Sequence, residues 1–252
     1  MTPTRRTVLR LVAGTLLARP AAARAAARAP LKAVVFDAFP IFDPRPIAAL
    51  AETLFGARGE ALARDWRTRQ FEYGWLRALM GRYADFWQVS DEALTVSAAQ
   101  LGLTLTADRR AQLMQAQLAL APWPDVAPTL DALARAGVRL AILSNLAPHM
   151  LAALTRSGLA DRFEAVLSTD AVRRYKPDPR AYRLAVDALG LARNEIAFAA
   201  FAGWDAAGAA SFGYPTVWVN RLAQPAEALG ATPDASGPDL ATLVEFVRRR
   251  AG

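Results

Sequence analysis

The first strong pattern along the chain is an apolar run over residues 31–36, interrupted only by Lys32. A continuous run of this kind predicts a strand buried on both faces of a sheet. Asp37 follows it directly, and a carboxylate at the end of a buried strand is costly unless it is paired or used. Ligands of open α/β sheets bind at the carboxyl ends of the strands. Asp37 is therefore a candidate functional residue, although a helix cap or a turn would also explain one such aspartate.

Helical periodicity follows, with an N-terminal break at Pro44 and Pro46. The apolar spacing predicts helices over residues 47–55, 60–80, 91–100 and 107–120. Residues 60–80 carry an aromatic face, and we expect most of its members to be ordinary core residues. Because residues 45–120 contain no clear strand, we interpret them as a helical insertion that forms a cap domain.

From residue 121 onward, short apolar strands alternate with helices. We expect strands at residues 138–143, 165–168, 196–202 and 216–219, and helices at 124–136, 148–157, 179–189, 206–212 and 240–249. Residues 232–238 read as a polar loop. Such alternation predicts a parallel sheet wound on both faces. The expected fold class is therefore α/β, a Rossmann-like doubly wound parallel sheet with an inserted helical cap; the core domain comprises residues 31–44 and 121–252, and the cap 45–120.

The formal charge of +7 is concentrated at the N-terminus. The first thirty residues hold six arginines and no acidic residue, and without those six the formal charge is about +1. A nucleic-acid footprint needs a basic face on the folded domain, so we expect no nucleic-acid partner.

Residues 1–30 have the features of an export signal. Arg5 and Arg6 precede a short apolar stretch over residues 11–18 and then a series of alanines, a pattern that predicts a twin-arginine signal and a periplasmic location. The apolar stretch is too short to span a bilayer, so no membrane attachment is expected once the signal is removed. A basic tail, or a start codon assigned too far upstream, is the alternative. The chain has no cysteine and a single histidine, His149, which limits metal binding and His-based catalysis.

Polar side chains recur where the later predicted strands end. Ser144 and Asn145 follow one strand, Lys176 lies in a loop before a helix, and Asp205 follows another strand. Taken singly, each of these residues could have a structural role, as a helix cap or as a solvated charge. Together they supply what a nucleophilic carboxylate such as Asp37 requires, because a nearby cation favours its ionised form.

This order of motifs resembles the haloacid dehalogenase superfamily, and in detail its type II 2-haloacid dehalogenases. The resemblance runs from residue 31 to about residue 221, through the strings FDAF, WRTRQFEYGWLRALMGRYADF, LAILSN, YKPDPRAY and WDAAGAASFGYPTVWVNR. It implies that Asp37 attacks the halogen-bearing carbon to form an ester, which water then hydrolyses at the aspartyl carbonyl. It implies further catalytic roles for Lys176, Arg67 and Asp205. The substrate-binding residues that it implies are Ala38, Phe39, Arg67, Phe71, Phe86, Ser144, Asn145, Tyr182 and Trp204.

The chain departs from the family pattern at two places. Phe39 occupies the position at which the superfamily's phosphatases carry a second aspartate, so we expect no metal, no cofactor and no magnesium-dependent phosphoryl transfer. The family motif DAYGTLFD appears as DAFPIFD, without its threonine, and the polar residues of SSNAWD are replaced by Ala200, Phe201 and Ala202.

We therefore expect a hydrolase that converts short 2-haloalkanoic acids to 2-hydroxy acids, with a small 2-haloacid as its partner. The alternative is a catalytically impaired or repurposed relative that binds a small organic acid. The sequence leaves a homodimer open.

Overall fold

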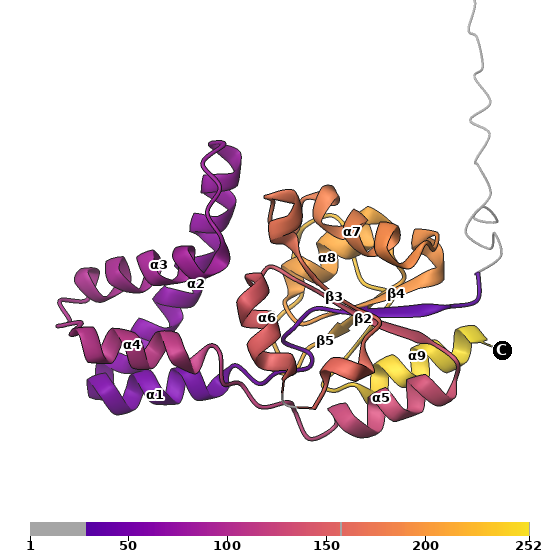
Figure 1. Ribbon diagram of the computed structural model, residues 1–252, viewed down its shortest axis with the longest axis horizontal. Helices are drawn as coiled ribbons and strands as arrows, with labels where there is room; N and C mark the ends of the chain where they lie inside the picture. The colour runs from indigo at the N-terminus through magenta and orange to yellow at the C-terminus, as the bar shows by residue number, and fades with distance from the viewer. Residues whose placement is uncertain (1–28, 157, 252) are drawn as a thin grey trace, which may run out of the picture.

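The computed structural model describes residues 29–156 and 158–251. Its centre is a six-stranded sheet with the order β3-β2-β1-β4-β5-β6 (Figure 1). Every strand pair is parallel, which confirms the predicted fold class. The strands are β1 (Ala33–Phe36), β2 (Arg139–Ser144), β3 (Ala165–Ser168), β4 (Ile196–Ala200), β5 (Thr216–Val219) and β6 (Ala235–Gly237).

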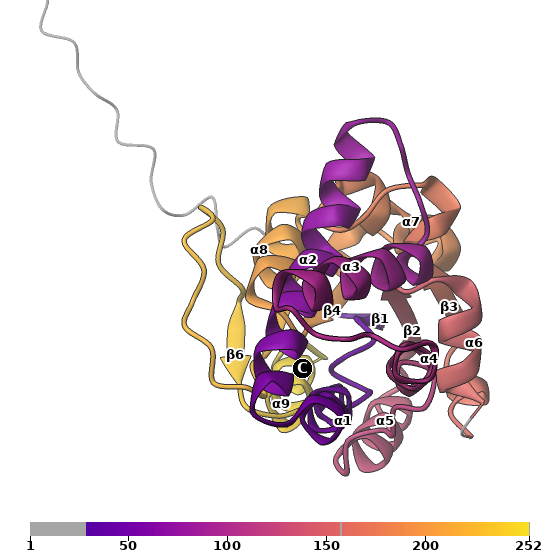
Figure 2. The same ribbon diagram turned by 90° about the vertical axis from the view of Figure 1, so that its left-hand side faces the viewer.

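Helices cover both faces of this sheet and form a separate group beside it (Figures 1 and 2). The helices are α1 (Arg45–Phe55), α2 (Gly59–Leu79), α3 (Phe86–Gln100), α4 (Ala107–Ala116), α5 (Val126–Arg135), α6 (Pro148–Thr155), α7 (Pro179–Leu189), α8 (Gly203–Phe212) and α9 (Ala241–Ala251). Short 3-10 turns lie at Gly56–Arg58, Ala160–Arg162, Thr169–Val172 and Arg193–Glu195. Within the described residues, no helix combines the length and the apolar character needed to cross a membrane.

The two faces of the sheet hold two cores, because side chains alternate along each strand. Val34 and Phe36 of β1 point into the core that α5, α6 and α9 cover. Ala33 and Val35 point to the opposite core, under α7 and α8. A strand buried on both faces must be apolar throughout, which explains the uninterrupted run from which β1 was predicted.

Helices α1–α4 pack around a third core. Leu62 and Leu94 are fully buried there. This helical group is joined to the loop before α7 by side-chain hydrogen bonds: Trp75 Nε1 donates to the carbonyl of Lys176 at 2.8 Å, and the Tyr83 hydroxyl donates to Asp170 at 2.8 Å. The end of α2 is thereby held over the carboxyl ends of the strands.

Several predicted boundaries were wrong. The helix predicted over residues 107–120 ends at Ala116, and the strand predicted over residues 196–202 ends at Ala200. Helix α3 begins at Phe86 rather than at residue 91, because Asp85 caps it and accepts a hydrogen bond from the Gln88 N–H at 2.8 Å. Residues 232–238 are more than a polar loop, since β6 pairs there with β5; this short edge strand has no apolar alternation to reveal it. Helix α8 begins at Gly203 rather than at residue 206, so Asp205 lies in its first turn.

The predicted export signal over residues 1–30 falls outside the described residues, apart from residues 29 and 30.

Candidate active site

Asp37 lies at the carboxyl end of β1, in the middle of the sheet. Strand β1 pairs with β2 on one side and with β4 on the other. The Asp37 N–H continues the ladder by donating to Ala199 O of β4 at 2.9 Å. Ser144 ends β2, and α8 follows β4, so the sheet order alone brings Ser144 and Asp205 to either side of Asp37.

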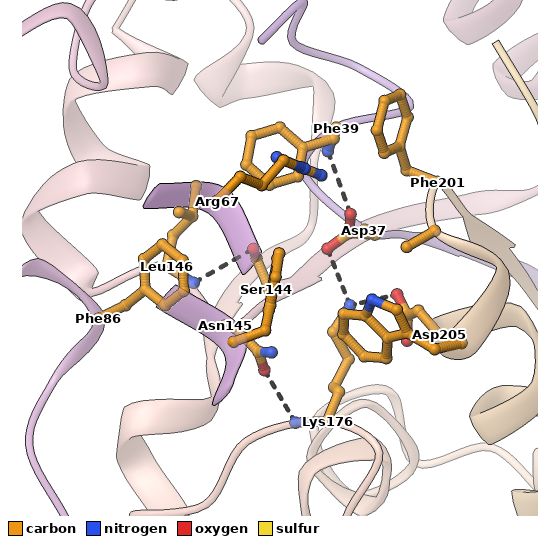
Figure 3. Close-up of a pocket in the computed structure, with 13 residues that line it drawn as sticks. Asp37, Phe39, Arg67, Phe86, Ser144, Asn145, Leu146, Lys176, Phe201 and Asp205 are labelled. Atoms are coloured by element: carbon orange, nitrogen blue, oxygen red, sulfur yellow. Dashed lines mark hydrogen bonds and ion pairs between the residues drawn. The ribbon is translucent and has the colours of Figure 1, made fainter. Parts of the chain in front are cut away.

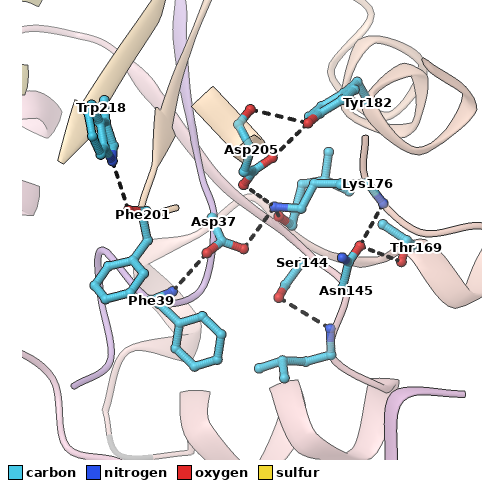
Figure 4. Close-up of polar contacts among 12 residues, drawn as sticks. Asp37, Phe39, Ser144, Asn145, Thr169, Lys176, Tyr182, Phe201, Asp205 and Trp218 are labelled. Carbon is cyan, nitrogen blue, oxygen red and sulfur yellow. Dashed lines mark hydrogen bonds and ion pairs between the residues drawn. The ribbon is translucent and has the colours of Figure 1, made fainter. Parts of the chain in front are cut away.

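Lys176 joins the two carboxylates (Figure 4). Its Nζ donates to Asp37 Oδ1 at 2.8 Å, to Asp205 Oδ2 at 2.7 Å and to Leu143 O at 3.2 Å. The lysine side chain is only 1% exposed. A buried ammonium is tolerated when its charge and all its donors have partners. Lys176 meets that requirement.

Burial and the neighbouring opposite charges shift the pKa values of Lys176 and Asp205 in opposite directions. Burial by itself lowers the pKa of Lys176, but Asp205 and Asp37 outweigh it and hold the pKa above its ordinary value. Burial raises the pKa of Asp205 to about 6; Lys176 limits the rise and Asp37 adds to it. Asp205 is steadied by the Tyr182 hydroxyl, which donates to its Oδ1 at 2.7 Å. The lysine is therefore charged at neutral pH, and Asp205 is mostly ionised.

Arg67 of α2 brings a second cation over the site. Its guanidinium lies 5.2 Å from the ring centre of Phe39, 5.4 Å from that of Phe71 and 5.7 Å from that of Phe201. Burial lowers its pKa, and the Asp37 charge opposes that shift. An arginine nevertheless stays protonated in proteins. In residues 29–156 and 158–251 its guanidinium has no hydrogen-bonding or ion-pairing side chain, so this charge is available to an anion.

Asn145 has an unused donor. Its Oδ1 accepts from the Lys176 N–H at 2.9 Å and from the Thr169 hydroxyl at 3.2 Å. Its Nδ2 is buried and has no hydrogen-bond partner among the described residues. A buried unsatisfied donor usually has a functional explanation. Here it lies in the same pocket as Arg67 and can donate to the same anion.

Aromatic rings close the pocket (Figure 3). The Phe39 and Phe201 rings are 5.8 Å apart, and Phe71 packs edge-on against Trp204 at 5.2 Å. The enclosed cavity measures about 10 Å³, which is roughly the space for one water molecule. A larger hollow of about 470 Å³ lies beyond it and shares these residues with the pocket: Arg67, Phe71, Phe201, Ala202 and Trp204. These side chains therefore separate the carboxylates from the surface.

The structure brings most of the predicted site residues together in this pocket. Those that line it are Asp37, Phe39, Arg67, Phe71, Phe86, Ser144, Asn145, Lys176, Trp204 and Asp205. Ala38 and Tyr182 do not line it. Ala38 is turned into the core, and Tyr182 lies behind Asp205, where it acts on the carboxylate rather than on a ligand.

Three further lining residues were not predicted: Leu146, Phe201 and Ala202. Leu146 has an ordinary apolar side chain that gives no chemical signal in the sequence, and Phe201 and Ala202 differ from the family pattern only by the loss of polar groups.

The arrangement suits displacement chemistry on a small anion. It offers the Asp37 carboxylate beside a lysine, a guanidinium with no hydrogen-bonding side chain among the described residues, and an apolar wall. Among residues 29–156 and 158–251, no three His, Cys, Asp or Glu side chains are grouped to hold a metal ion.

Comparisons with known proteins agree with this geometry. The family model of haloacid dehalogenase-like hydrolases matches residues 12–213. An (S)-2-haloacid dehalogenase of Pseudomonas sp. (strain YL) is 42% identical over 224 residues, and one of Xanthobacter autotrophicus is 46% identical over 247; each match covers 88% of this chain and 97% of the relative. A crystal structure of the Xanthobacter autotrophicus L-2-haloacid dehalogenase with chloropropionic acid covalently bound superposes with a TM-score of 0.80 at 40% identity, over 86% of this chain and 98% of that one. The chain therefore belongs to the haloacid dehalogenase-like hydrolases, in the family of the (S)-2-haloacid dehalogenases.

Proposed function

We propose that this chain hydrolyses short-chain 2-haloalkanoic acids to 2-hydroxy acids through an ester on Asp37. The observation that carries the proposal is the pairing of Asp37 with buried Lys176 in a pocket that Arg67 also lines, with no ion-pair partner for Arg67 among the described residues. A covalently bound chloropropionic acid in a relative of the same fold supports it.

In the first step, Arg67 holds the substrate carboxylate while Asp37 attacks the halogen-bearing carbon. Charge-assisted bonds from a guanidinium to a carboxylate are among the stronger ones in proteins. Among the described residues, Asp37 Oδ2 accepts only the Phe39 N–H, at 3.3 Å, whereas Oδ1 is tied to Lys176. Oδ2 is therefore the freer nucleophile. The carbon–halogen bond breaks as the ester forms, and the halide leaves with its electron pair, so no general acid is needed.

In the second step, water attacks the carbonyl carbon of the Asp37 ester and releases the 2-hydroxy acid. Asp205 lines the pocket and is mostly ionised at neutral pH. It is the group available to take the proton of the water. Lys176 then lies beside the regenerated Asp37 carboxylate and neutralises it.

Asp37→Asn should abolish halide release from L-2-chloropropionate and monobromoacetate, because a neutral amide cannot displace a halide. The side chains are nearly isosteric, so circular dichroism and the melting temperature should change little. In a single turnover of the wild type in ¹⁸O-labelled water, the label should enter Asp37, and full activity should persist in excess chelator.

Wild-type protein that binds these acids without releasing halide would favour the repurposed relative. Label that passes directly into the 2-hydroxy acid would exclude the ester.

Activity should fall as the pH drops through about 6, because Asp205, whose pKa is raised to about 6, then gains a proton and can no longer act as a base. The profile of kcat/KM reports the free enzyme. In Asp205→Asn, the residual activity should be lower by a factor of about 10² or more, and its acid limb near pH 6 should disappear. If the acid limb of the kcat/KM profile near pH 6 persisted in Asp205→Asn, a group other than Asp205 would be responsible for it.

We propose further that the chain is exported through the twin-arginine route. The support is the pair Arg5-Arg6, followed by a weakly apolar stretch and small residues. Replacing both arginines by lysine should retain the protein in the cytoplasm, as measured by cell fractionation. The double substitution of Arg19 and Arg24 by lysine is the control, and it should leave export intact. Equal export of both variants would contradict the proposal.

We also propose a homodimer through the end of α2. Leu76, Leu79 and Met80 are 52%, 83% and 64% exposed, and this end of the helix projects from the molecule (Figure 1). A cluster of exposed apolar side chains marks an interaction site. Leu79→Lys should convert a dimer to a monomer in light scattering, because it buries a charge at the contact. The control is Leu229→Lys, which alters a leucine elsewhere that is 60% exposed; this variant should remain a dimer. A monomeric wild type would refute the proposal.

A further inference from the structure

The loop that carries the nucleophile, residues 37–43, lacks the polar groups expected to fix it. It contains no hydroxyl side chain, and Pro40 has no N–H to donate. Nevertheless the Phe39 N–H reaches Asp37 Oδ2 at 3.3 Å (Figure 3). A backbone donor is useful in catalysis only if its peptide is held in place beforehand. The Phe39 N–H shares its peptide plane with Ala38 O, whereas the Phe39 carbonyl lies in the next plane, so the planes on both sides of the Phe39 Cα must be held.

Hydrogen bonds to the carbonyl groups of the loop hold both planes. Ala38 O accepts from the Ile41 and Phe42 N–H groups at 3.1 and 2.9 Å, which closes a tight turn. The next two carbonyls are held from outside the loop: Phe39 O by Trp123 Nε1 at 3.0 Å, and Pro40 O by Arg221 Nη2 at 2.8 Å.

Trp123 and Arg221 are themselves fixed. Trp123 is 8% exposed, and its backbone N–H donates to Ile41 O at 2.9 Å. The guanidinium groups of Arg45 and Arg221 each lie 4.5 Å from the centre of its ring. Arg221 also pairs with Asp125 at 2.8 Å, and Asp125 accepts the Leu240 N–H at 3.0 Å. None of these contacts involves a residue that lines the pocket, apart from Phe39 itself.

We propose that Trp123 and Arg221 are positioning residues for the nucleophile: by holding the carbonyls of Phe39 and Pro40, they aim the Phe39 N–H at Asp37 and keep the Phe39 ring against Arg67. The proposal rests on the proposed function, because the step it serves is the attack by Asp37. Phe39 connects the nucleophile, Arg67 and Trp123. Its N–H contacts the nucleophile, its ring lies under Arg67 at 5.2 Å, and its carbonyl is the group that Trp123 holds.

Trp123→Phe is the direct test, because it removes the indole N–H and keeps an aromatic ring between the two arginines. The rate of ester formation in a single turnover should fall about three- to tenfold, the usual effect of one neutral hydrogen bond. KM should stay within about twofold, since Arg67 still binds the substrate. Arg221→Lys, which retains a donor, should lose less than Arg221→Met.

The matched control is Trp66→Phe. The Trp66 indole N–H also donates to a backbone carbonyl, Ser90 O at 2.8 Å, and its side chain is 2% exposed, but this bond lies within the helical group α1–α4. Trp66→Phe should lower the melting temperature as Trp123→Phe does, with ester formation unchanged. Equal rates of ester formation in the wild type and Trp123→Phe, or equal losses in the two tryptophan variants, would overturn the proposal.

A second measurement does not depend on turnover. In ¹⁵N-labelled protein, hydrogen exchange of the Phe39 amide should be at least about threefold faster in Trp123→Phe than in the wild type, and unchanged in Trp66→Phe. If the wild type releases no halide but this difference is present, the proposed function fails and the positioning stands. If halide is released but exchange and ester formation are both unchanged, the positioning fails alone.

Discussion

The buried ammonium of Lys176 is the interaction on which the site depends. It lies between Asp37 and Asp205 at 2.8 and 2.7 Å, and removing the lysine would leave two buried carboxylates without their cation. Three segments far apart in the chain must therefore meet: the end of β1, the loop before α7 and the first turn of α8. Trp75 ties the helical group to the same point through the carbonyl of Lys176. The ion triad thus fixes the nucleophile and also the helices that cover it.

The pocket above the triad is small, and it contains a cation, Arg67, that has no hydrogen-bonding side chain among the described residues. Aromatic rings surround Arg67, and the enclosed space is about that of one water molecule. A charge in such surroundings favours an anionic partner strongly, since little solvent competes with it. Arg67 and the Asn145 amide line one pocket with Asp37, so both can donate to the same small anion beside it.

The departures from the family pattern look more serious in the sequence than in the structure. The threonine after the nucleophile is absent, yet the Phe39 N–H supplies a donor to Asp37. Pro40 cannot donate, yet its carbonyl is one of the points at which the loop is held from outside. Phe201 replaces a polar residue and becomes part of the wall under Arg67. The apolar replacements therefore reshape the site while Asp37, Lys176 and Asp205 keep their contacts.

The sequence by itself determined the elements whose signal is local. The apolar run before Asp37 predicted β1, and alternating strands and helices predicted the parallel sheet. Polar residues near strand ends predicted the polar part of the pocket, and the resemblance to the haloacid dehalogenases supplied Arg67 and the aromatic wall. The sequence missed β6, which has no apolar alternation, and the start of α3, which the Asp85 cap sets. Only the tertiary structure placed the residues whose roles depend on contacts between distant parts of the chain. Tyr182 lies behind Asp205 because α7 packs against α8, and Trp123 and Arg221 reach the nucleophile loop from positions 84 and 181 residues away from the carbonyls that they hold. Contacts over such separations depend on how the elements pack, and no local pattern of residues encodes them.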